Sequence, residues 1–239
     1  MARLLVFTAT YNEAEIIESW VRRVTMAAPD ADILVVDDNS PDGTGRILDR
    51  LAGEIGSLIV VHRGGKSGLA SAHLEAMRFA QEHEYEVLVT LDADGSHLPE
   101  QIPRLLDVLP SADFVIGTRS RGGTHQAGAL RQILSSGANG LARVMIPTGL
   151  SEYTTSFRAF DRDAMDVLTG SEFVSGGYAF FVECIEILHQ AGLLLIEVPI
   201  DFVDRTHGTS KIPKSQIFMS IQALVTLGVR RRSGRSQRA

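Results

Sequence analysis

Two carboxylates, Asp92 and Asp94, stand two residues apart in the segment LVTLDADGSHLPE, directly after an apolar run. Two unit charges about 4 Å apart repel by roughly 4 kcal/mol at an effective dielectric near 20, so a cation or a set of donors must offset them. Mg²⁺ or Mn²⁺ suits such oxygen ligands and is completed by water and the oxygens of a substrate diphosphate. The alternative interpretation is that the two aspartates only form a turn after the strand, because a lone D-x-D motif occurs by chance in many proteins.

Further polar residues follow two other apolar runs. Asp37 and Asp38 follow one of them, and the motif TYNE, with Tyr11 and Glu13, follows another. So many carboxylates in one place are costly unless a divalent ion or hydroxyl donors lie among them. The second acidic pair therefore favours the metal interpretation of the first.

The apolar runs must position these motifs, and they alternate with helix-like patterns. The alternation predicts a single α/β domain with a mostly parallel, Rossmann-like sheet flanked by helices. Ligands bind at the carboxyl ends of parallel strands, so we expect the polar motifs to line one crevice. The predicted strands are 4–8, 33–36, 58–61, 87–91 and 114–116.

Local signals predict the other elements. Asn12 and Glu15 form an N-x-x-E pair that resembles a capping box before a helix over 16–24. Turn-forming clusters at 39–45 and 63–68 separate strands from helices. The remaining expectations are a helix at 69–81, a long polar loop at 117–131, a helix at 129–145, a short strand near Phe157, a helix at 179–190, a strand at 193–198, a polar loop at 201–215 and a helix at 215–229.

Basic side chains could supply an anion pocket beside the acids. Arg119 follows the run at 114–116, and the long loop could bring Arg131 to the same place; guanidinium groups bind phosphate oxygens bidentately. Taken singly, each is an ordinary surface ion-pair partner. Lys66 is either a phosphate contact or a solvated loop cation, since Val60 stands where a P-loop needs Gly. The second polar loop adds Arg205, Lys211 and Lys214.

Composition narrows the class of protein. A chain of 239 residues that is 44% hydrophobic is long enough for one large domain. The net charge is −6 although five of the 23 basic residues lie within 230–239, so an acidic body argues against nucleic-acid binding. With one cysteine, no secretory signal and no apolar stretch of the ~20 residues that span a bilayer, we expect a cytoplasmic protein.

The assembled motifs resemble those of polyprenol (dolichol) phosphate mannosyltransferases, inverting family 2 glycosyltransferases with the GT-A fold. The resemblance covers nearly the whole chain, and its specificity comes from the order and spacing of the motifs rather than from any one of them. The motifs are TYNE, VVDDNSPDGT, GKSGLASA, DADGSHLPEQIP, VIGTR, SSGANGLAR, SFRAF, GYAFFVE and EVPIDFVDRTHGTSK.

The resemblance implies a role for each group of residues. It implies nucleotide-sugar contacts at the ends of the first two strands and a Mg²⁺ or Mn²⁺ site in the DADGSH motif. It also implies a pocket for the lipid phosphate and basic residues that meet the donor diphosphate. The nucleotide-sugar contacts are Tyr11, Glu13 and Asp38, with Asp37 in the same crevice, and the metal site is Asp92, Asp94 and Ser96. The pocket for the lipid phosphate is Arg119, Arg131 and Ser135, and the basic residues that meet the diphosphate are Arg205 and Lys211.

The implied reaction transfers a hexose, mannose from GDP-mannose in this family, to a polyprenyl monophosphate. An ionised phosphate oxygen attacks the anomeric carbon without needing a base, and a single displacement inverts that carbon. One rival is a family 2 enzyme that moves a UDP-sugar hexose to a hydroxyl acceptor, which does need a base. Another is a non-catalytic scaffold that binds nucleotide or lipid.

Some positions depart from the family pattern, and two expectations concern the membrane. Ala9 replaces Pro, Glu152 and Ser156 replace Asp and Gly, and Phe181 replaces Gln. We expect a glycosyltransferase domain at 1–229 and a disordered Arg-rich tail at 230–239. The helix at 215–229 either packs on the domain or, with the tail, binds the inner membrane face peripherally.

Overall fold

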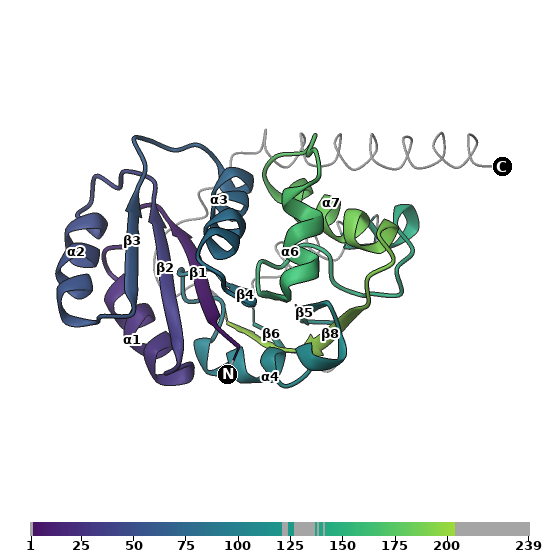
Figure 1. Ribbon diagram of the computed structural model, residues 1–239, viewed down its shortest axis with the longest axis horizontal. Helices are drawn as coiled ribbons and strands as arrows, with labels where there is room; N and C mark the ends of the chain where they lie inside the picture. Colours follow the sequence, from purple (N-terminus) through teal and green to yellow (C-terminus); the bar gives the residue numbers. More distant parts are fainter. Residues whose placement is uncertain (1, 121–123, 127–136, 138, 141, 204–239) are drawn as a thin grey trace.

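The computed structural model describes residues 2–120, 124–126, 137, 139–140 and 142–203. Its centre is a seven-stranded sheet with the order β3-β2-β1-β4-β7-β5-β8 (Figure 1). All its pairings are parallel except those of β7, which runs antiparallel to both of its neighbours. The strands are β1 (Leu4–Thr10), β2 (Ala31–Asp37), β3 (Leu58–His62), β4 (Val87–Thr90), β5 (Phe114–Thr118), β7 (Arg158–Phe160) and β8 (Leu195–Pro199). The predicted fold class is confirmed.

Helices cover both faces of this sheet (Figure 1). Consecutive residues of β1 point to opposite faces, because Val6 belongs to one apolar core with Trp20 and Phe7 belongs to the other with Ala76. A strand buried on both faces reads as a continuous apolar run rather than an alternating one. The first core involves α1 (Ile17–Ala27), α2 (Thr44–Glu54) and α4 (Ile102–Leu106); the second involves α3 (Leu69–Glu82), α6 (Arg162–Thr169) and α7 (Tyr178–Gln190).

The predicted capping box before α1 is wrong. The helix begins at Ile17 after an N-cap, Ile16, that makes no side-chain cap hydrogen bond. Asn12 lies further back in a left-handed conformation with φ of 59°. Its backbone N–H donates to Ser40 Oγ at 2.9 Å, so this stretch is held by the loop after β2 rather than by a local cap.

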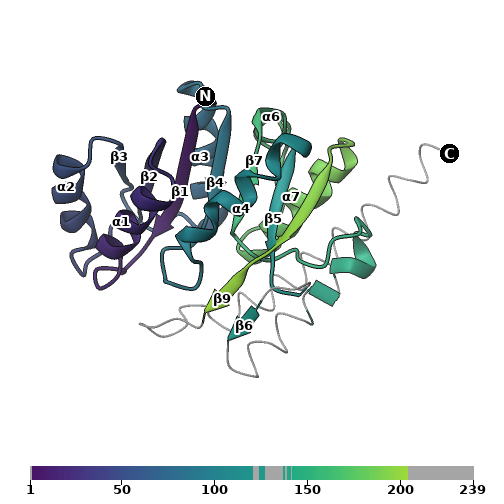
Figure 2. The same ribbon diagram turned by 90° about the horizontal axis from the view of Figure 1, so that it is seen from below.

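A short parallel pair of strands lies beyond the main sheet. β9 (Asp201–Val203) follows β8 and pairs with β6 (Thr124–Gln126), in stretches that were expected to be polar loops (Figure 2). Phe202 also bridges to His97, and the Val203 N–H donates to the Ser96 carbonyl at 3.2 Å. The chain after β8 is therefore tied to the acidic motif after β4.

Some elements were not predicted, and others lie outside the described residues. The region 99–111 forms two 3₁₀ turns, η1 (Pro99–Gln101) and η2 (Leu109–Ser111), around α4, and α6 is only 8 residues long. The expected helix at 215–229, the tail and most of the loop at 117–131 are not described. Among the described residues, no helix has the length and apolar character needed to cross a bilayer.

Candidate active site at the carboxyl edge of the sheet

The polar motifs gather at one edge because β1 lies between β2 and β4. The Asp38 N–H donates to the Thr10 carbonyl at 3.1 Å, and the Leu91 N–H donates to the Phe7 carbonyl at 3.2 Å. The residues after all three strands are thereby fixed next to one another, where open parallel sheets bind ligands. The predicted convergence of these motifs is confirmed.

Asp92 is the more open of the two acids in the DADGSH motif. Its side chain is 38% exposed. Ser156 Oγ donates to Asp92 Oδ1 at 2.6 Å, and the Trp20 indole N–H donates to the Asp92 carbonyl at 3.1 Å. The buried indole of Trp20 on α1 and the segment before β7 therefore hold the backbone and the carboxylate of this residue.

His97 supports the backbone of the same motif. Its Nδ1 accepts a hydrogen bond from the Asp92 N–H at 3.1 Å, which leaves the ring proton on Nε2, 3.1 Å from Thr155 Oγ1. Burial, opposed by the Asp92 charge, keeps the His97 pKa below its usual value. His97 is thus a neutral residue that shapes the turn.

Asp94 and Ser96 complete the motif in a tight turn. Gly95, with φ of 81°, adopts the left-handed conformation that glycine tolerates best. The Ser96 N–H and Oγ then donate to Asp94 Oδ1 at 3.0 and 2.5 Å. The carboxylates of Asp92 and Asp94 with the Ser96 hydroxyl form an all-oxygen set, which fits a hard divalent cation.

Asp37 and Asp38 have internal partners that offset their charges. Asp37 Oδ2 accepts from the Ser40 N–H at 3.2 Å, and the side chain of Asp37 is 2% exposed. Asp38 forms an ion pair with Arg63, whose side chain is 9% exposed. The charges of this second acidic pair are therefore offset by a hydroxyl residue and an arginine, so the pair does not by itself favour a metal ion at Asp92 and Asp94.

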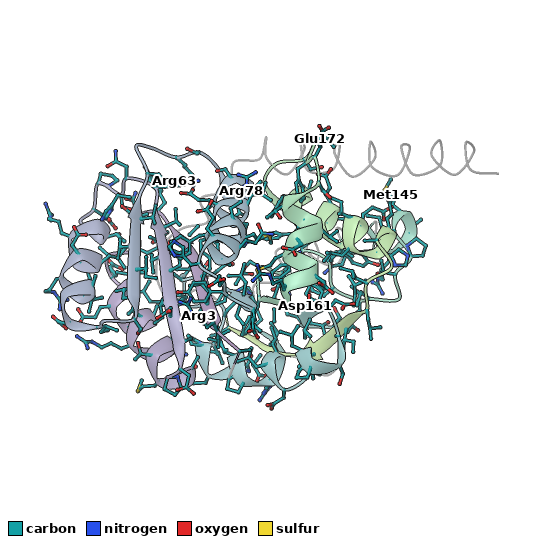
Figure 3. All side chains as sticks on the ribbon, in the orientation of Figure 1. Arg3, Arg63, Arg78, Met145, Asp161 and Glu172 are labelled. Atoms are coloured by element: carbon teal, nitrogen blue, oxygen red, sulfur yellow. The ribbon has the colours of Figure 1, made fainter. Side chains whose placement is uncertain are left out.

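Arg63 was missed in the sequence, although it directly follows β3. The rule that ligands bind at the carboxyl ends of parallel strands singled out the residues after β1, β2 and β4, and it applies equally to β3. Arg63 also donates to Ser71 Oγ at 2.8 Å, so it links β2 to the start of α3. Figure 3 shows Arg63 at this edge, whereas Arg3 and Asp161 lie toward the other end of the sheet.

The residues after β1 are tied to the loop that precedes α2. The Lys66 ammonium lies 4.7 Å from the centre of the Tyr11 ring, a cation–π contact between two predicted donor-binding residues. The Glu13 N–H donates to Thr44 Oγ1 at 2.9 Å. The structure brings these residues together, and their contacts with a nucleotide stay a prediction.

Arg119 is held in a largely buried ion pair. Its Nε and Nη2 each lie 2.9 Å from Glu152 Oε2, and its guanidinium lies 4.9 Å from the centre of the Phe202 ring. Burial raises the pKa of Glu152, but the Arg119 charge and hydrogen bonds from Thr154 and Asn139 outweigh it and lower the pKa. The other predicted basic and acceptor residues, Arg131, Ser135, Arg205 and Lys211, lie outside the described residues.

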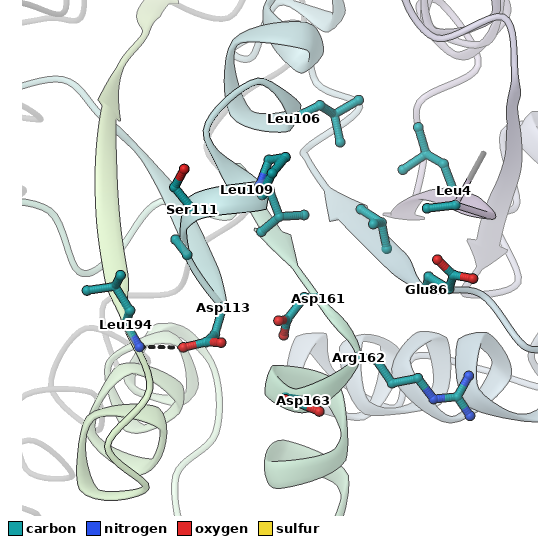
Figure 4. Close-up of a pocket in the computed structure, with 14 residues that line it drawn as sticks. Leu4, Glu86, Leu106, Leu109, Ser111, Asp113, Asp161, Arg162, Asp163 and Leu194 are labelled. Carbon is teal, nitrogen blue, oxygen red and sulfur yellow. Dashed lines mark hydrogen bonds between the residues drawn. The ribbon is translucent and has the colours of Figure 1, made fainter.

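A cavity of about 980 Å³ lies at the opposite edge of the sheet, near Leu4 and Leu194 (Figure 4). Three carboxylates lie close together there: those of Asp113, Asp161 and Asp163. Asp113 accepts a hydrogen bond from the Leu194 N–H at 2.6 Å, and Asp161 caps α6 by accepting from the Ala164 N–H at 2.8 Å. Asp113 and Asp161 therefore have partners within the fold, and all three acids lie at the other end of the sheet from the DADGSH motif.

Solved structures of similar fold place the chain in a known architecture. Glucosyl-3-phosphoglycerate synthase from Mycobacterium tuberculosis, in complex with Mn²⁺, UDP and glucosyl-3-phosphoglycerate, matches 95% of this chain and 78% of its own with a TM-score of 0.69 and 20% identity. The mannosyltransferase PcManGT from Pyrobaculum calidifontis, in complex with GDP-Man and Mn²⁺, matches 95% of this chain and 73% of its own with a TM-score of 0.62 and 19% identity. The fold is therefore the GT-A fold.

Sequence relatives define the family. The model of glycosyl transferase family 2 matches residues 5–169. An undecaprenyl-phosphate mannosyltransferase from Micrococcus luteus is 40% identical over 88% of this chain and 87% of its own. A polyprenol monophosphomannose synthase from Mycolicibacterium smegmatis is 38% identical over 98% of this chain and 90% of its own. The chain belongs to glycosyltransferase family 2, and the resemblance stated from its motifs is confirmed.

Proposed function

We propose that the protein transfers mannose from GDP-mannose to a polyprenyl monophosphate with inversion at the anomeric carbon. The observation that carries this proposal is the pair Asp92 and Asp94 at the carboxyl end of β4, in a chain whose relatives over most of its length are named for transfer of mannose to such lipids. The donor's diphosphate is the natural complement of a cation held by these carboxylates.

We assign the metal site to Asp92, Asp94 and Ser96, with Mn²⁺ or Mg²⁺ as the ion. When bound, the ion neutralises charge that develops on the departing nucleoside diphosphate. Asp94 is oriented by the two Ser96 donors. We assign the nucleoside to the same edge, beside Tyr11, Lys66 and the loop before α2. Asp38 is held there by its ion pair with Arg63.

The acceptor needs alignment rather than deprotonation. A phosphate monoester oxygen is already ionised near neutral pH, so the protein has no proton to remove before attack. Arg119, fixed by Glu152 and Phe202, is assigned to this phosphate together with Arg131 and Ser135. Arg205 and Lys211 are assigned to the donor diphosphate on the basis of the sequence.

We also propose that the protein works at the inner membrane face as a peripheral protein. The acceptor lipid resides in a bilayer, and 230–239 carry five arginines without an acid. Basic clusters of this kind bind anionic lipid surfaces with about 1 kcal/mol per residue. Cosedimentation with anionic vesicles, compared between the full chain and a chain ending at residue 229, tests this point.

The transfer reaction itself is tested with the purified protein, Mn²⁺ and a short polyprenyl phosphate. Each of GDP-mannose, GDP-glucose, UDP-glucose and UDP-galactose is supplied in turn, and the lipid product is identified by mass spectrometry. We expect a mannosyl lipid from GDP-mannose and no product with Asp94→Asn. Transfer only from a UDP-sugar contradicts the donor assignment, whereas no transfer to lipid phosphate from any donor contradicts the proposed function.

A further inference from the structure

The segment before β7 holds the DADGSH motif at two points. Ser156 Oγ donates to Asp92 Oδ1 at 2.6 Å, and Thr155 Oγ1 lies 3.1 Å from His97 Nε2. His97 Nδ1 accepts from the Asp92 N–H at 3.1 Å. Two adjacent hydroxyl residues thus contact both the carboxylate of Asp92 and the ring that fixes its backbone.

Ser156 is itself rigidly placed. It is 3% exposed, and Thr90 Oγ1 on β4 donates to its carbonyl at 2.6 Å. The next residues form β7, which pairs with β4 through Thr90 and Arg158. The hydroxyl that contacts Asp92 is therefore anchored to the same strand that delivers Asp92.

The carboxylate of Asp92 needs such an anchor. The terminal torsion of an Asp side chain is broad, so packing or hydrogen bonds must set its orientation. The bond to Oδ1 fixes this torsion. Among the described residues, the titratable group beside Asp92 Oδ2 is the His97 ring, whose Nδ1 lies 3.7 Å away. This nitrogen has no proton to donate to Oδ2, because it accepts a hydrogen bond from the Asp92 N–H. Oδ2 is therefore the oxygen that remains for a cation.

We propose that Ser156 is a positioning residue that orients Asp92 for the cation and diphosphate of the donor. The proposal rests on the proposed function for the identity of the site, and it gives Ser156 no contact with the substrate. Outer hydrogen bonds to carboxylates that bind metal ions typically change metal affinity by 10- to 100-fold. The hydroxyl of Ser156 is then a determinant of how tightly this chain binds its metal–nucleotide pair.

Calorimetry with Mn²⁺ and GDP, and separately with Mn²⁺ and UDP, measures this effect without turnover. We expect Ser156→Ala to bind the preferred Mn²⁺–nucleotide pair about tenfold more weakly than the wild type, and Ser156→Thr, which keeps the hydroxyl, to recover most of the affinity. Thr25→Val is the matched control because its hydroxyl donates to the Val21 carbonyl at 3.0 Å within α1. The control should bind as the wild type does.

Thermal unfolding of the metal-free proteins separates positioning from folding, and kinetics add a second test. Ser156→Ala should unfold within a few degrees of the wild type, raise the KM for Mn²⁺ about tenfold and change kcat by less than threefold. Equal affinity in the wild type and Ser156→Ala, or equal weakening in Ser156→Thr, overturns the proposal. Absence of Mn²⁺-dependent nucleotide binding in the wild type overturns it as well.

These outcomes are distinct from failure of the proposed function. A wild type that binds Mn²⁺ and UDP but does not transfer mannose contradicts the mannosyltransferase assignment. The role of Ser156 is then still decided by the difference in affinity between Ser156→Ala and Ser156→Thr with UDP.

Discussion

Arg119 at the end of β5 is paired with Glu152, whose side chain is 1% exposed, at 2.9 Å. Glu152 also accepts hydrogen bonds from Asn139 Nδ2 and the Thr154 N–H at 2.9 and 3.0 Å. Removing one member of a buried ion pair leaves the other charge uncompensated, at a cost of about 3–5 kcal/mol. The pair therefore fixes Arg119 at the edge where the acceptor phosphate is proposed to bind.

Glu152→Gln should lower the free energy of unfolding by about 3 kcal/mol, measured by chemical denaturation at pH 7. The control is Glu100→Gln, which removes an exposed ion pair with Arg23 at 2.7 Å and should cost less than about 1 kcal/mol. Equal costs for the two variants would contradict the structural importance of the Glu152 pair.

The same pair predicts a pH dependence. The pKa of Glu152 is lowered in the folded protein, so its stabilising contribution is present above its unfolded pKa and is lost as the pH falls through the folded value. The difference in unfolding free energy between wild type and Glu152→Gln should be constant above about pH 5 and shrink below about pH 4.5. A difference that grows as the pH falls would have the wrong sign.

Asp94→Ala should abolish transfer while the protein remains folded, because we assign this carboxylate to the ligand and metal. Asp94→Asn separates charge from hydrogen bonding, since its amide oxygen still accepts from Ser96. We expect at least a 100-fold loss of kcat/KM in both variants, with circular dichroism like that of the wild type. Substantial activity in Asp94→Asn would remove Asp94 from the metal site.

Arg131→Ala tests the acceptor pocket that the motifs imply. We expect the KM for polyprenyl phosphate to rise about tenfold or more, as loss of a charge-assisted contact implies, while the KM for GDP-mannose changes less than threefold. Arg162→Ala, at the opposite edge of the sheet beside the cavity in Figure 4, is the control. An unchanged acceptor KM would contradict the assignment.

Gly117→Ala tests the packing between β5 and the residue after β8. A Cβ on Gly117 would lie 2.7 Å from Ile200 Cδ1 and 2.9 Å from its Cγ2, so the variant should lose about 1–3 kcal/mol of stability. In the background of Ile200→Ala, the same change should cost much less, because the clashing atoms are gone. Additive losses in the double variant would show that the clash is not the cause.

The fold was predictable because the parallel strands are buried on both faces and appear as apolar runs. A second rule, that parallel strands deliver their carboxyl ends to one edge, correctly predicted that Asp92 and Asp94 lie at that edge beside the residues after β1 and β2. Short elements were missed: α6 has 8 residues, too few for a clear helical period. The N-x-x-E signal of Asn12 failed because a contact with Ser40, distant in sequence, determines the local conformation.

The partners of the site residues were less predictable. Ser156 and Glu152 precede an antiparallel strand, so they reach the carboxyl edge at the beginning of β7 rather than at the end of a strand. A search limited to residues that follow parallel strands therefore misses Ser156 and Glu152. Ser156, one of the positions that depart from the family pattern, contacts the carboxylate assigned to the metal.

The insertion of β7 between β4 and β5 also has a consequence for the order of assembly. The strands β1 to β4 pair with one another in the sheet, whereas β5 has only β7 and β8 as partners. During translation, β4 and β5 each present an unpaired edge until residue 160 has emerged, and such edges invite pairing with other chains. A nascent chain stalled between 118 and 158 should therefore be the form most in need of a chaperone.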